Sequence, residues 1–283
     1  MQFLTPRELR SYDLEAALRA VDAQLELELE LAPGAGAESE AEADRSSPIF
    51  VLSAGWRSGS TLVQRLLCSD PSMLMWGEPF GEAIPVPRMA SMLEAFVAKA
   101  ANRAEDAYES LAADTPLSEQ WIANLNPGFA ALRRAHRAFF ETLLAAPARE
   151  KGFERWGAKW VRLTAHHARY LQWLYPRARI VLLVRDPVAS YRSYRGKRWY
   201  AVNPVARVDN VFKFVAHWKY VTDSFLEAGA GLDALLLRYE DLIGDPKQVE
   251  RLAQYCELDV DSSVLSVEIR GLRKKRKQLS SWQ

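Results

Sequence analysis

Short continuous runs of apolar residues alternate along this chain with longer stretches in which apolar residues recur every three or four positions. Runs of this kind predict strands, and continuous apolar runs are typical of parallel strands buried on both faces. The predicted strands cover residues 49–52, 73–76, 156–163, 179–184 and 232–242. The longer stretches predict helices over residues 60–67, 89–101, 128–145, 164–174, 187–197, 207–228 and 248–256. Because strands alternate with helices, we expect an α/β fold in three layers, with a central parallel sheet flanked by helices.

The first 47 residues differ in composition from the rest of the chain. Residues 4–31 are charged and rich in leucine, with helical spacing in their first part. Residues 25–31 (LELELEL) alternate as a strand would, but their high helix propensity favours a helix. Residues 32–48 are small and acidic and contain proline and glycine, as in a linker or surface loop. We therefore expect a helical appendage and an acidic linker over residues 1–47, followed by one domain over residues 48–283.

The overall composition is ordinary for a soluble globular chain. Of the 283 residues, 49% are hydrophobic and 26% are charged, and the formal net charge is +1. A chain so close to neutral has no general basic surface for nucleic acid or an anionic membrane. No apolar segment is long enough to span a bilayer and no signal peptide is evident, so we expect a cytoplasmic chain or an excised catalytic domain. Cys68 and Cys256 lie in apolar helical contexts, where reduced core thiols are expected.

A turn rich in glycine and hydroxyl groups connects the first strand of the domain to its first helix. The turn spans residues 53–61 and reads SAGWRSGST. The first backbone N–H groups of a helix lack partners and lie at the positive end of the helix dipole, which favours an anion there. Arg57 adds a full charge, and Ser58, Ser60 and Thr61 add hydroxyl donors. We therefore predict an anion site here rather than a plain strand-to-helix turn.

This turn departs in two respects from the nucleotide P-loop, which reads G-x-x-x-x-G-K-[ST]. Gly55 and Gly59 are one residue too close together, and Ser60 stands where the P-loop has its lysine. Both features matter for binding a triphosphate, so the fold is expected to be P-loop-like without an ATP-binding loop. A P-loop kinase acting on a small molecule remains an alternative interpretation.

A second polar motif follows the clearest strand. The sequence VRDPVASYRSYR (184–195) places Arg185 at the strand end and Ser193 eight residues later, in the following helix. The planar guanidinium group binds a phosphate through two hydrogen bonds, and a serine hydroxyl can add a third. The alternative is that Arg185 and Asp186 only cap the helix or pair locally. Parallel strands present their carboxyl ends at one edge of a sheet, where ligands bind. We expect four segments to meet at this edge: residues 53–61, Lys159, Arg185 and Tyr239.

The two motifs together resemble those of the sulfotransferases that use 3′-phosphoadenosine 5′-phosphosulfate (PAPS). RSGST (57–61) is similar to their 5′-phosphosulfate loop, and Arg185 with Ser193 is similar to their 3′-phosphate-binding segment. In motif the chain is nearest to the carbohydrate and tyrosylprotein sulfotransferases. The resemblance implies a sulfotransferase domain over residues 48–283, PAPS as the donor, and 3′,5′-adenosine bisphosphate as the spent product.

The same resemblance implies roles for residues outside these two motifs. The segment LLLRYEDLIGDP places Tyr239 near the adenine, and Lys197 stands where the tyrosylprotein enzymes have another basic residue on the 3′-phosphate. The basic tail, residues 269–283, resembles the family's C-terminal loop that closes on the 3′-phosphate, although a solvated charge run is the alternative. The cofactor-binding residues implied in this way are Arg57, Ser58, Gly59, Ser60, Thr61, Arg185, Ser193, Lys197, Tyr239, Lys274 and Lys275.

The resemblance also implies a catalytic base. WGEPF resembles the tyrosylprotein sulfotransferase segment that provides the base, here Glu78, and GAKW places Lys159 where that family has a lysine on the transferring group. Sulfuryl transfer, like phosphoryl transfer, passes through a loose transition state, so positioning and charge stabilisation dominate. Arg57 and Lys159 are expected to stabilise charge on the bridging oxygen, with no metal. Many sulfotransferases use a histidine base, so His166 and His167 remain alternatives, although adjacent histidines also suit a helix cap.

The sequence leaves the class of acceptor open. A small molecule, a glycan, a lipid and a tyrosine peptide all offer a suitable hydroxyl. Aromatic residues close in sequence to the motifs suit either an acceptor wall or an ordinary core. These are Trp156, Trp160, Tyr194, Trp199 and Tyr200. Besides the kinase, a catalytically silent nucleotide-binding protein is a further alternative.

Overall fold

The computed structural model describes residues 47–81, 85–100, 111–123, 125, 127, 129–196, 208–227 and 231–267. Some of the predicted features fall outside these ranges. They are the appendage over residues 1–46, Lys197, Trp199, Tyr200, and the basic tail with Lys274 and Lys275.

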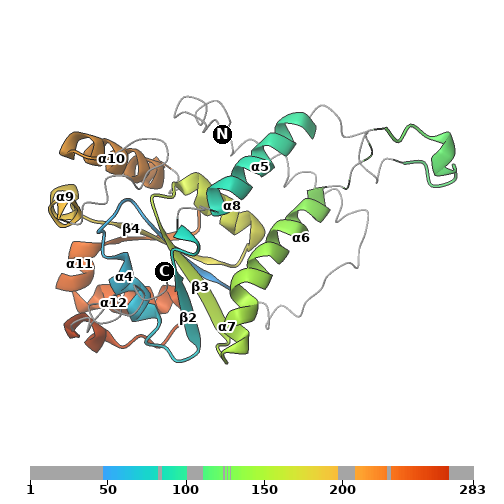
Figure 1. The fold of residues 1–283 in the computed structure, drawn as a ribbon. Helices are drawn as coiled ribbons and strands as arrows, with labels where there is room; N and C mark the ends of the chain where they lie inside the picture. The colour runs from blue at the N-terminus through green and yellow to red at the C-terminus, as the bar shows by residue number, and fades with distance from the viewer. Residues whose placement is uncertain are drawn as a thin grey trace, which may run out of the picture.

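A five-stranded parallel sheet forms the centre of the molecule (Figure 1). Its strands are β1 (Ile49–Ser53), β2 (Met73–Gly77), β3 (Arg155–Val161), β4 (Arg179–Val184) and β5 (Ala234–Arg238). They lie in the order β2-β3-β1-β4-β5, and every neighbouring pair is parallel. The chain crosses from one side of β1 to the other between β3 and β4. Open parallel sheets bind ligands at such a switch point, outside the carboxyl ends of the strands.

Helices cover the sheet, as the alternating pattern predicts (Figure 1). They are α4 (Ser60–Leu67), α5 (Pro85–Ala100), α6 (Phe129–Phe140), α7 (Ala146–Glu150), α8 (Ala165–Leu174), α9 (Pro187–Arg195), α10 (Val211–Glu227), α11 (Tyr239–Gly244) and α12 (Pro246–Cys256). A π-helical turn, Glu141–Ala145, joins α6 to α7.

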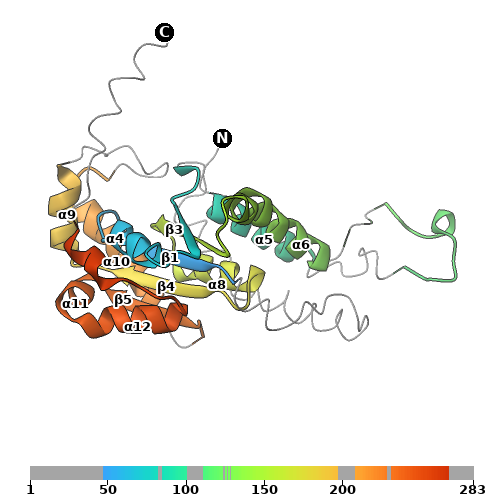
Figure 2. The ribbon, with the colours of Figure 1, turned by 90° about the horizontal axis from the view of Figure 1, so that it is seen from below.

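Two hydrophobic cores lie on opposite faces of the sheet, because successive side chains of a strand point to opposite sides. From β1, Phe50 and Leu52 belong to the core built with α5, α6, α8 and α10. Ile49 and Val51 belong to the core built with α4, α11 and α12. Figure 1 shows these two groups of helices on either side of the strands, and Figure 2 shows the same elements from below. The predicted three-layer α/β fold is therefore confirmed.

The largest departure from the predicted elements is at residues 232–242. The strand there ends at Arg238, and Tyr239 begins α11. β5 is an edge strand, and its neighbour β4 ends at Val184 opposite Arg238, so the hydrogen-bonded ladder cannot continue. The acidic first turn of α11 also suits the positive end of a helix dipole. Lys159, expected at a strand end, lies within β3 instead, because that strand continues to Val161.

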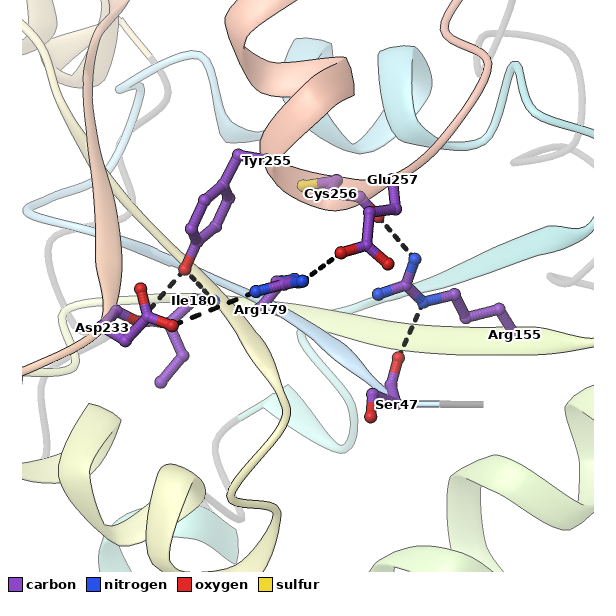
Figure 3. A network of polar contacts seen from close by, with 8 residues as sticks. All are labelled: Ser47, Arg155, Arg179, Ile180, Asp233, Tyr255, Cys256 and Glu257. Carbon is purple, nitrogen blue, oxygen red and sulfur yellow. Dashed lines mark hydrogen bonds and ion pairs between the residues drawn. The ribbon is translucent and has the colours of Figure 1, made fainter. Parts of the chain in front are cut away.

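A network of polar contacts ties the amino ends of the central strands to the end of α12 (Figure 3). Arg155, the buried first residue of β3, donates from Nε to the Ser47 carbonyl oxygen (2.7 Å) and from Nη1 to the Cys256 carbonyl oxygen (2.5 Å). Arg179, the first residue of β4, pairs with Glu257 just beyond α12. This network holds the strands at the edge opposite their carboxyl ends, and it leaves the expected ligand-binding edge to other residues.

Candidate functional site

The turn after β1 enters α4 through two residues with a left-handed backbone. Arg57 has a φ of 63° and Gly59 a φ of 90°. Gly59 is the N-cap of α4, and its carbonyl oxygen accepts a hydrogen bond from the Leu62 N–H (2.8 Å). Between them, Ser58 is buried, and its Oγ has no hydrogen-bond partner among the described residues. A long side chain such as arginine seldom adopts positive φ, and such strain gathers at functional sites.

The two predicted phosphate-binding motifs meet at the carboxyl edge of the sheet. Nε of Arg57 donates to Oγ of Ser193 on α9 (2.9 Å). Nη1 of Arg185, which follows β4, donates to the carbonyl oxygen of Arg57 (2.9 Å). The two contacts bring both arginines to this edge of the sheet, where their positive charges favour an anionic ligand. The structure therefore brings together the segments that the sequence predicts to converge.

Tyr239, the first residue of α11, contacts both the turn and Arg185. The guanidinium group of Arg185 lies over the Tyr239 ring, 4.2 Å from its centroid. A Cβ atom added at Gly59 would lie only 2.1 Å from Cδ2 of the same ring. Glycine is therefore required at position 59 both by its backbone angle and by the closeness of this ring. Nε of Arg185 is buried and has no hydrogen-bond partner within the described part of the chain.

Side chains from two further helices hold the turn between β4 and α9. Nε1 of Trp218, on α10, donates to the carbonyl oxygen of Arg185 (3.0 Å). The backbone N–H of Asp186 donates to Oε1 of Glu240, on α11 (3.0 Å). The Asp186 side chain caps α9, as the local alternative suggests, but the Arg185 side chain reaches other segments. Sequence reasoning missed Trp218 and Glu240, although Glu240 directly follows Tyr239.

Glu78 and Lys159 form an ion pair near the same edge of the sheet. Nζ of Lys159 lies 2.5 Å from Oε1 of Glu78, and the Glu78 N–H donates to the Lys159 carbonyl oxygen (2.9 Å). The Lys159 side chain is 7% exposed and that of Glu78 is 41% exposed, so the carboxylate is the partner that solvent reaches. Glu78 also has a left-handed backbone, with a φ of 47°. Gln64 of α4 donates to the Met75 carbonyl oxygen (2.8 Å), which holds α4 against the strand that precedes Glu78.

The two histidines proposed as alternative bases open α8. The Thr164 backbone N–H donates to Nδ1 of His167 (3.1 Å), so His167 completes the cap of this helix. Burial, with a smaller effect from His166, lowers the pKa of His167 to about 4. His166 is exposed in the first turn of the helix. The helix-cap role that adjacent histidines suit is therefore seen for His167.

A third histidine, His217 on α10, contacts the turn after β1. Its ring lies 5.3 Å from the ring of Trp56, over which the Arg162 guanidinium also lies (4.7 Å). Burial, and to a smaller extent the charge of Arg162, lower the pKa of His217 to about 4. This contact joins parts of the chain that are distant in sequence, so no local pattern could reveal it.

The aromatic residues near the motifs belong to the interior wherever they are described. Trp156 and Trp160 of β3 surround Phe50, with ring centroids 5.7 and 5.9 Å from it. Tyr194 of α9 is buried, and its hydroxyl donates to the Val208 carbonyl oxygen (2.8 Å). For Trp156, Trp160 and Tyr194 the structure therefore favours the ordinary core over an acceptor wall.

Among the described helices, none combines the length and the apolar character that crossing a bilayer requires. Within the same residues, no three histidine, cysteine or acidic side chains are grouped as a metal site would need.

Comparisons with known proteins identify the family to which this chain belongs. Residues 48–262 match the model of the sulfotransferase family. No curated protein sequence matches the chain. Among solved structures, the sulfotransferase domain of the Synechococcus PCC 7002 olefin synthase is 19% identical, with 78% of each chain covered and a TM-score of 0.44. Mouse sulfotransferase SULT7A1, solved in complex with PAP, is 14% identical, with 81% of this chain and 68% of that chain covered and a TM-score of 0.38. Because the family model spans most of the sequence, the chain belongs to the sulfotransferase family.

Proposed function

We propose that this sulfotransferase moves a sulfuryl group from PAPS to a hydroxyl of its acceptor, without a metal. The observation that carries the proposal is the pair of contacts that join Arg57 to Ser193 and Arg185 to Arg57. They connect the two segments whose motifs resemble the family's 5′-phosphate and 3′-phosphate sites. A nucleotide with phosphates at both ends needs cationic donors at two places, and the guanidinium groups of Arg57 and Arg185 supply them.

The residues present fit such a nucleotide. Two buried donors, Ser58 Oγ and Arg185 Nε, have no partner in the described part of the chain. A buried donor without a hydrogen-bond partner costs about 1–3 kcal/mol of stability. A phosphate oxygen that accepts from the donor would remove this cost. Arg185 and Ser193 are proposed to hold the 3′-phosphate, and the family resemblance places Tyr239 near the adenine. The 5′-phosphate is assigned to Arg57, Ser58, Gly59, Ser60 and Thr61. The further cations proposed on the 3′-phosphate, outside the described residues, are Lys197, Lys274 and Lys275.

Bound PAPS supplies the sulfuryl group and the bridging oxygen from which it departs. Arg57 and Lys159 stabilise the negative charge that develops on that oxygen. Glu78 takes the proton of the acceptor hydroxyl, and its partly exposed carboxylate can be reached from solvent. The ion pair with Lys159 fixes the direction of the Glu78 side chain. An in-line transfer through a loose transition state requires little from the protein beyond this positioning and charge stabilisation.

Two features of the structure favour Glu78 over the histidines as the base. Glu78 directly follows the carboxyl end of β2, at the edge where the phosphate motifs meet, and its backbone is strained. Nδ1 of His167 accepts the Thr164 N–H and so is engaged in a helix cap. Among the described residues no such hydrogen bond engages His166, so His166 is the alternative that the experiment must separate from Glu78.

Calorimetric titration with 3′,5′-adenosine bisphosphate, without metal, tests the nucleotide site. Arg185→Ala should weaken binding about 10- to 100-fold, since hydrogen bonds from charged groups contribute about 1.5–3 kcal/mol each. Arg192→Ala removes an equal charge from the exposed face of α9 and is the matched control, expected to bind as the wild type does. Absence of bisphosphate binding, together with Mg²⁺-dependent binding of ATP, would replace the sulfotransferase proposal by the kinase alternative.

Transfer from radiolabelled PAPS to a panel of phenols, sugars and aliphatic alcohols tests the chemistry. Glu78→Gln should lower kcat about 10²- to 10⁴-fold while bisphosphate affinity stays near wild type. His166→Ala is the parallel variant and should keep its activity. Loss of activity in His166→Ala but not in Glu78→Gln would assign the base to the histidine. Tight bisphosphate binding without transfer to any acceptor would support a catalytically silent nucleotide-binding protein.

A further inference from the structure

A tight turn follows β2 and begins with the proposed base. The Gly81 N–H donates to the carbonyl oxygen of Glu78 (2.9 Å), which closes a four-residue turn. Pro79 holds the second position of this turn, and Phe80 holds the third with a φ of 59°. This is the pattern of a type II turn, whose third position favours glycine because φ is positive there. Phe80 therefore occupies a position in which a bulky side chain strains the backbone.

Packing of the Phe80 ring within the fold does not compensate for this strain. Phe80 is 61% exposed, and it belongs to none of the hydrophobic cores that the described residues form. A buried aromatic ring would stabilise the fold, but a ring left in water contributes little. Strained backbone that brings no gain in packing is typical of functional sites, where a ligand supplies the contact that the fold lacks.

The turn has a fixed starting point and open space beside it. The Glu78 N–H donates to the Lys159 carbonyl oxygen (2.9 Å), which ties the first residue of the turn to β3. A Cβ atom added at Gly81 would meet no atom within 4 Å. Because the turn is closed, its residues lie within about 7 Å of one another. An acceptor that places its hydroxyl at Glu78 therefore comes within reach of the Phe80 ring.

We infer that Phe80 selects acceptors whose hydroxyl is carried by an apolar group, aromatic or aliphatic. This inference rests on the proposed function and names the class of substrate for the same site. Contact with an apolar acceptor removes the exposed ring from water, which is favourable. A sugar would instead lose hydrogen bonds to water against the ring. Among the acceptors that the sequence leaves open, phenols and aliphatic alcohols are therefore favoured over glycans.

Thermal unfolding without ligand tests whether the strain at Phe80 serves the fold. Phe80→Gly should raise the Tm by about 2 °C, because glycine adopts positive φ without strain. Tyr220 is the matched control, since it is another exposed aromatic residue (48%) but lies within the helix α10. Tyr220→Gly should lower the Tm, because glycine is unfavourable inside a helix. A lower Tm in Phe80→Gly would mean that the ring stabilises the fold, and the inference would be wrong.

Transfer from radiolabelled PAPS to 2-naphthol, 1-octanol and glucose tests the selection of acceptors. Phe80→Gly should lower kcat/KM for the two apolar alcohols about tenfold, through a higher KM. Its kcat/KM for glucose and its affinity for 3′,5′-adenosine bisphosphate should stay as in the wild type. Phe80→Leu keeps apolar surface without an aromatic face. Retained transfer to both alcohols in this variant would support an aliphatic acceptor, and a loss with 2-naphthol alone would support an aromatic one.

The outcomes separate this inference from the proposal on which it rests. If the wild-type protein transfers the sulfuryl group to glucose but to neither apolar alcohol, the inference is wrong and the proposed function stands. An equal loss with all three acceptors in Phe80→Gly also contradicts the inference, because the ring would then act on Glu78 and not on the acceptor. If the wild-type protein binds the bisphosphate but transfers to no acceptor, the proposed function itself fails.

Discussion

Gly59 offers a direct test of the packing between the anion-binding turn and Tyr239. In Gly59→Ala the new Cβ would lie 2.1 Å from Cδ2 and 2.5 Å from Cε2 of the Tyr239 ring, far inside van der Waals contact. The backbone φ of 90° adds a second penalty, because a residue with a Cβ is strained there. The strain costs about 1–3 kcal/mol, and overpacking against a ring typically costs about 1–3 kcal/mol more.

Gly152 separates these two costs. It has a nearly equal φ of 87°, but a Cβ added there meets nothing within 4 Å. Gly152→Ala should therefore lower the free energy of unfolding by the strain alone, and Gly59→Ala by about 1–3 kcal/mol more. Urea denaturation of the two variants and the wild type, without ligand, measures the difference. If the ring moves away to relieve the contact, part of the cost should appear as weaker bisphosphate binding, since Arg185 lies on that ring.

A double-mutant cycle completes the test. Removing the ring in Tyr239→Ala should reduce the cost of Gly59→Ala to the strain that Gly152→Ala shows, so the two substitutions should couple by at least about 1 kcal/mol. If Gly59→Ala costs no more than Gly152→Ala and leaves bisphosphate affinity unchanged, the close packing of Gly59 on Tyr239 is wrong.

Three further predictions concern the stability of the fold. Gly157→Ala should destabilise the fold by about 3 kcal/mol or more in urea denaturation. Its Cβ would lie 2.3 Å from the Ile49 backbone oxygen, which cannot move aside. A variant as stable as the wild type would contradict the spacing between β1 and β3. Arg155→Met should cost about 3 kcal/mol, because it removes the two buried hydrogen bonds that Arg155 donates to backbone carbonyl oxygens. Bisphosphate affinity should be unchanged, since this network lies at the opposite edge of the sheet. The pKa values of His167 and His217 are lowered from 6.5 to about 4, so the unfolded chain binds more protons between these values and stability should fall as the pH falls from 6.5 to 4. In variants that lack either histidine, the free energy of unfolding should fall less between pH 6.5 and pH 4 than in the wild type. If both variants lose as much stability over this range as the wild type, the burial of these two rings is wrong.

Local patterns along the chain were enough to predict the fold class and most of the elements. Continuous apolar runs mark buried strands and helical spacing marks the helices between them, because both depend on residues a few positions apart. The candidate anion-binding turn could also be located, since its glycine, arginine and hydroxyl residues lie within one short segment. Its N-cap role and left-handed backbone at Gly59 are properties of that segment alone. The strand predicted over residues 232–242 was too long because its end depends on where its neighbour β4 stops.

Contacts between segments that are far apart in the sequence could be identified only in the tertiary structure. The stacking of Tyr239 on Arg185, the hydrogen bond from Trp218, and the ion pair of Glu78 with Lys159 each join elements that are far apart in the chain. Sequence motifs indicated which side chains could bind an anion, but not which neighbours hold them. The strand order β2-β3-β1-β4-β5 and the packing of helices on both faces of the sheet decide those neighbours. The direction of a side chain depends on how whole helices and strands pack against one another. No short stretch of sequence specifies that packing.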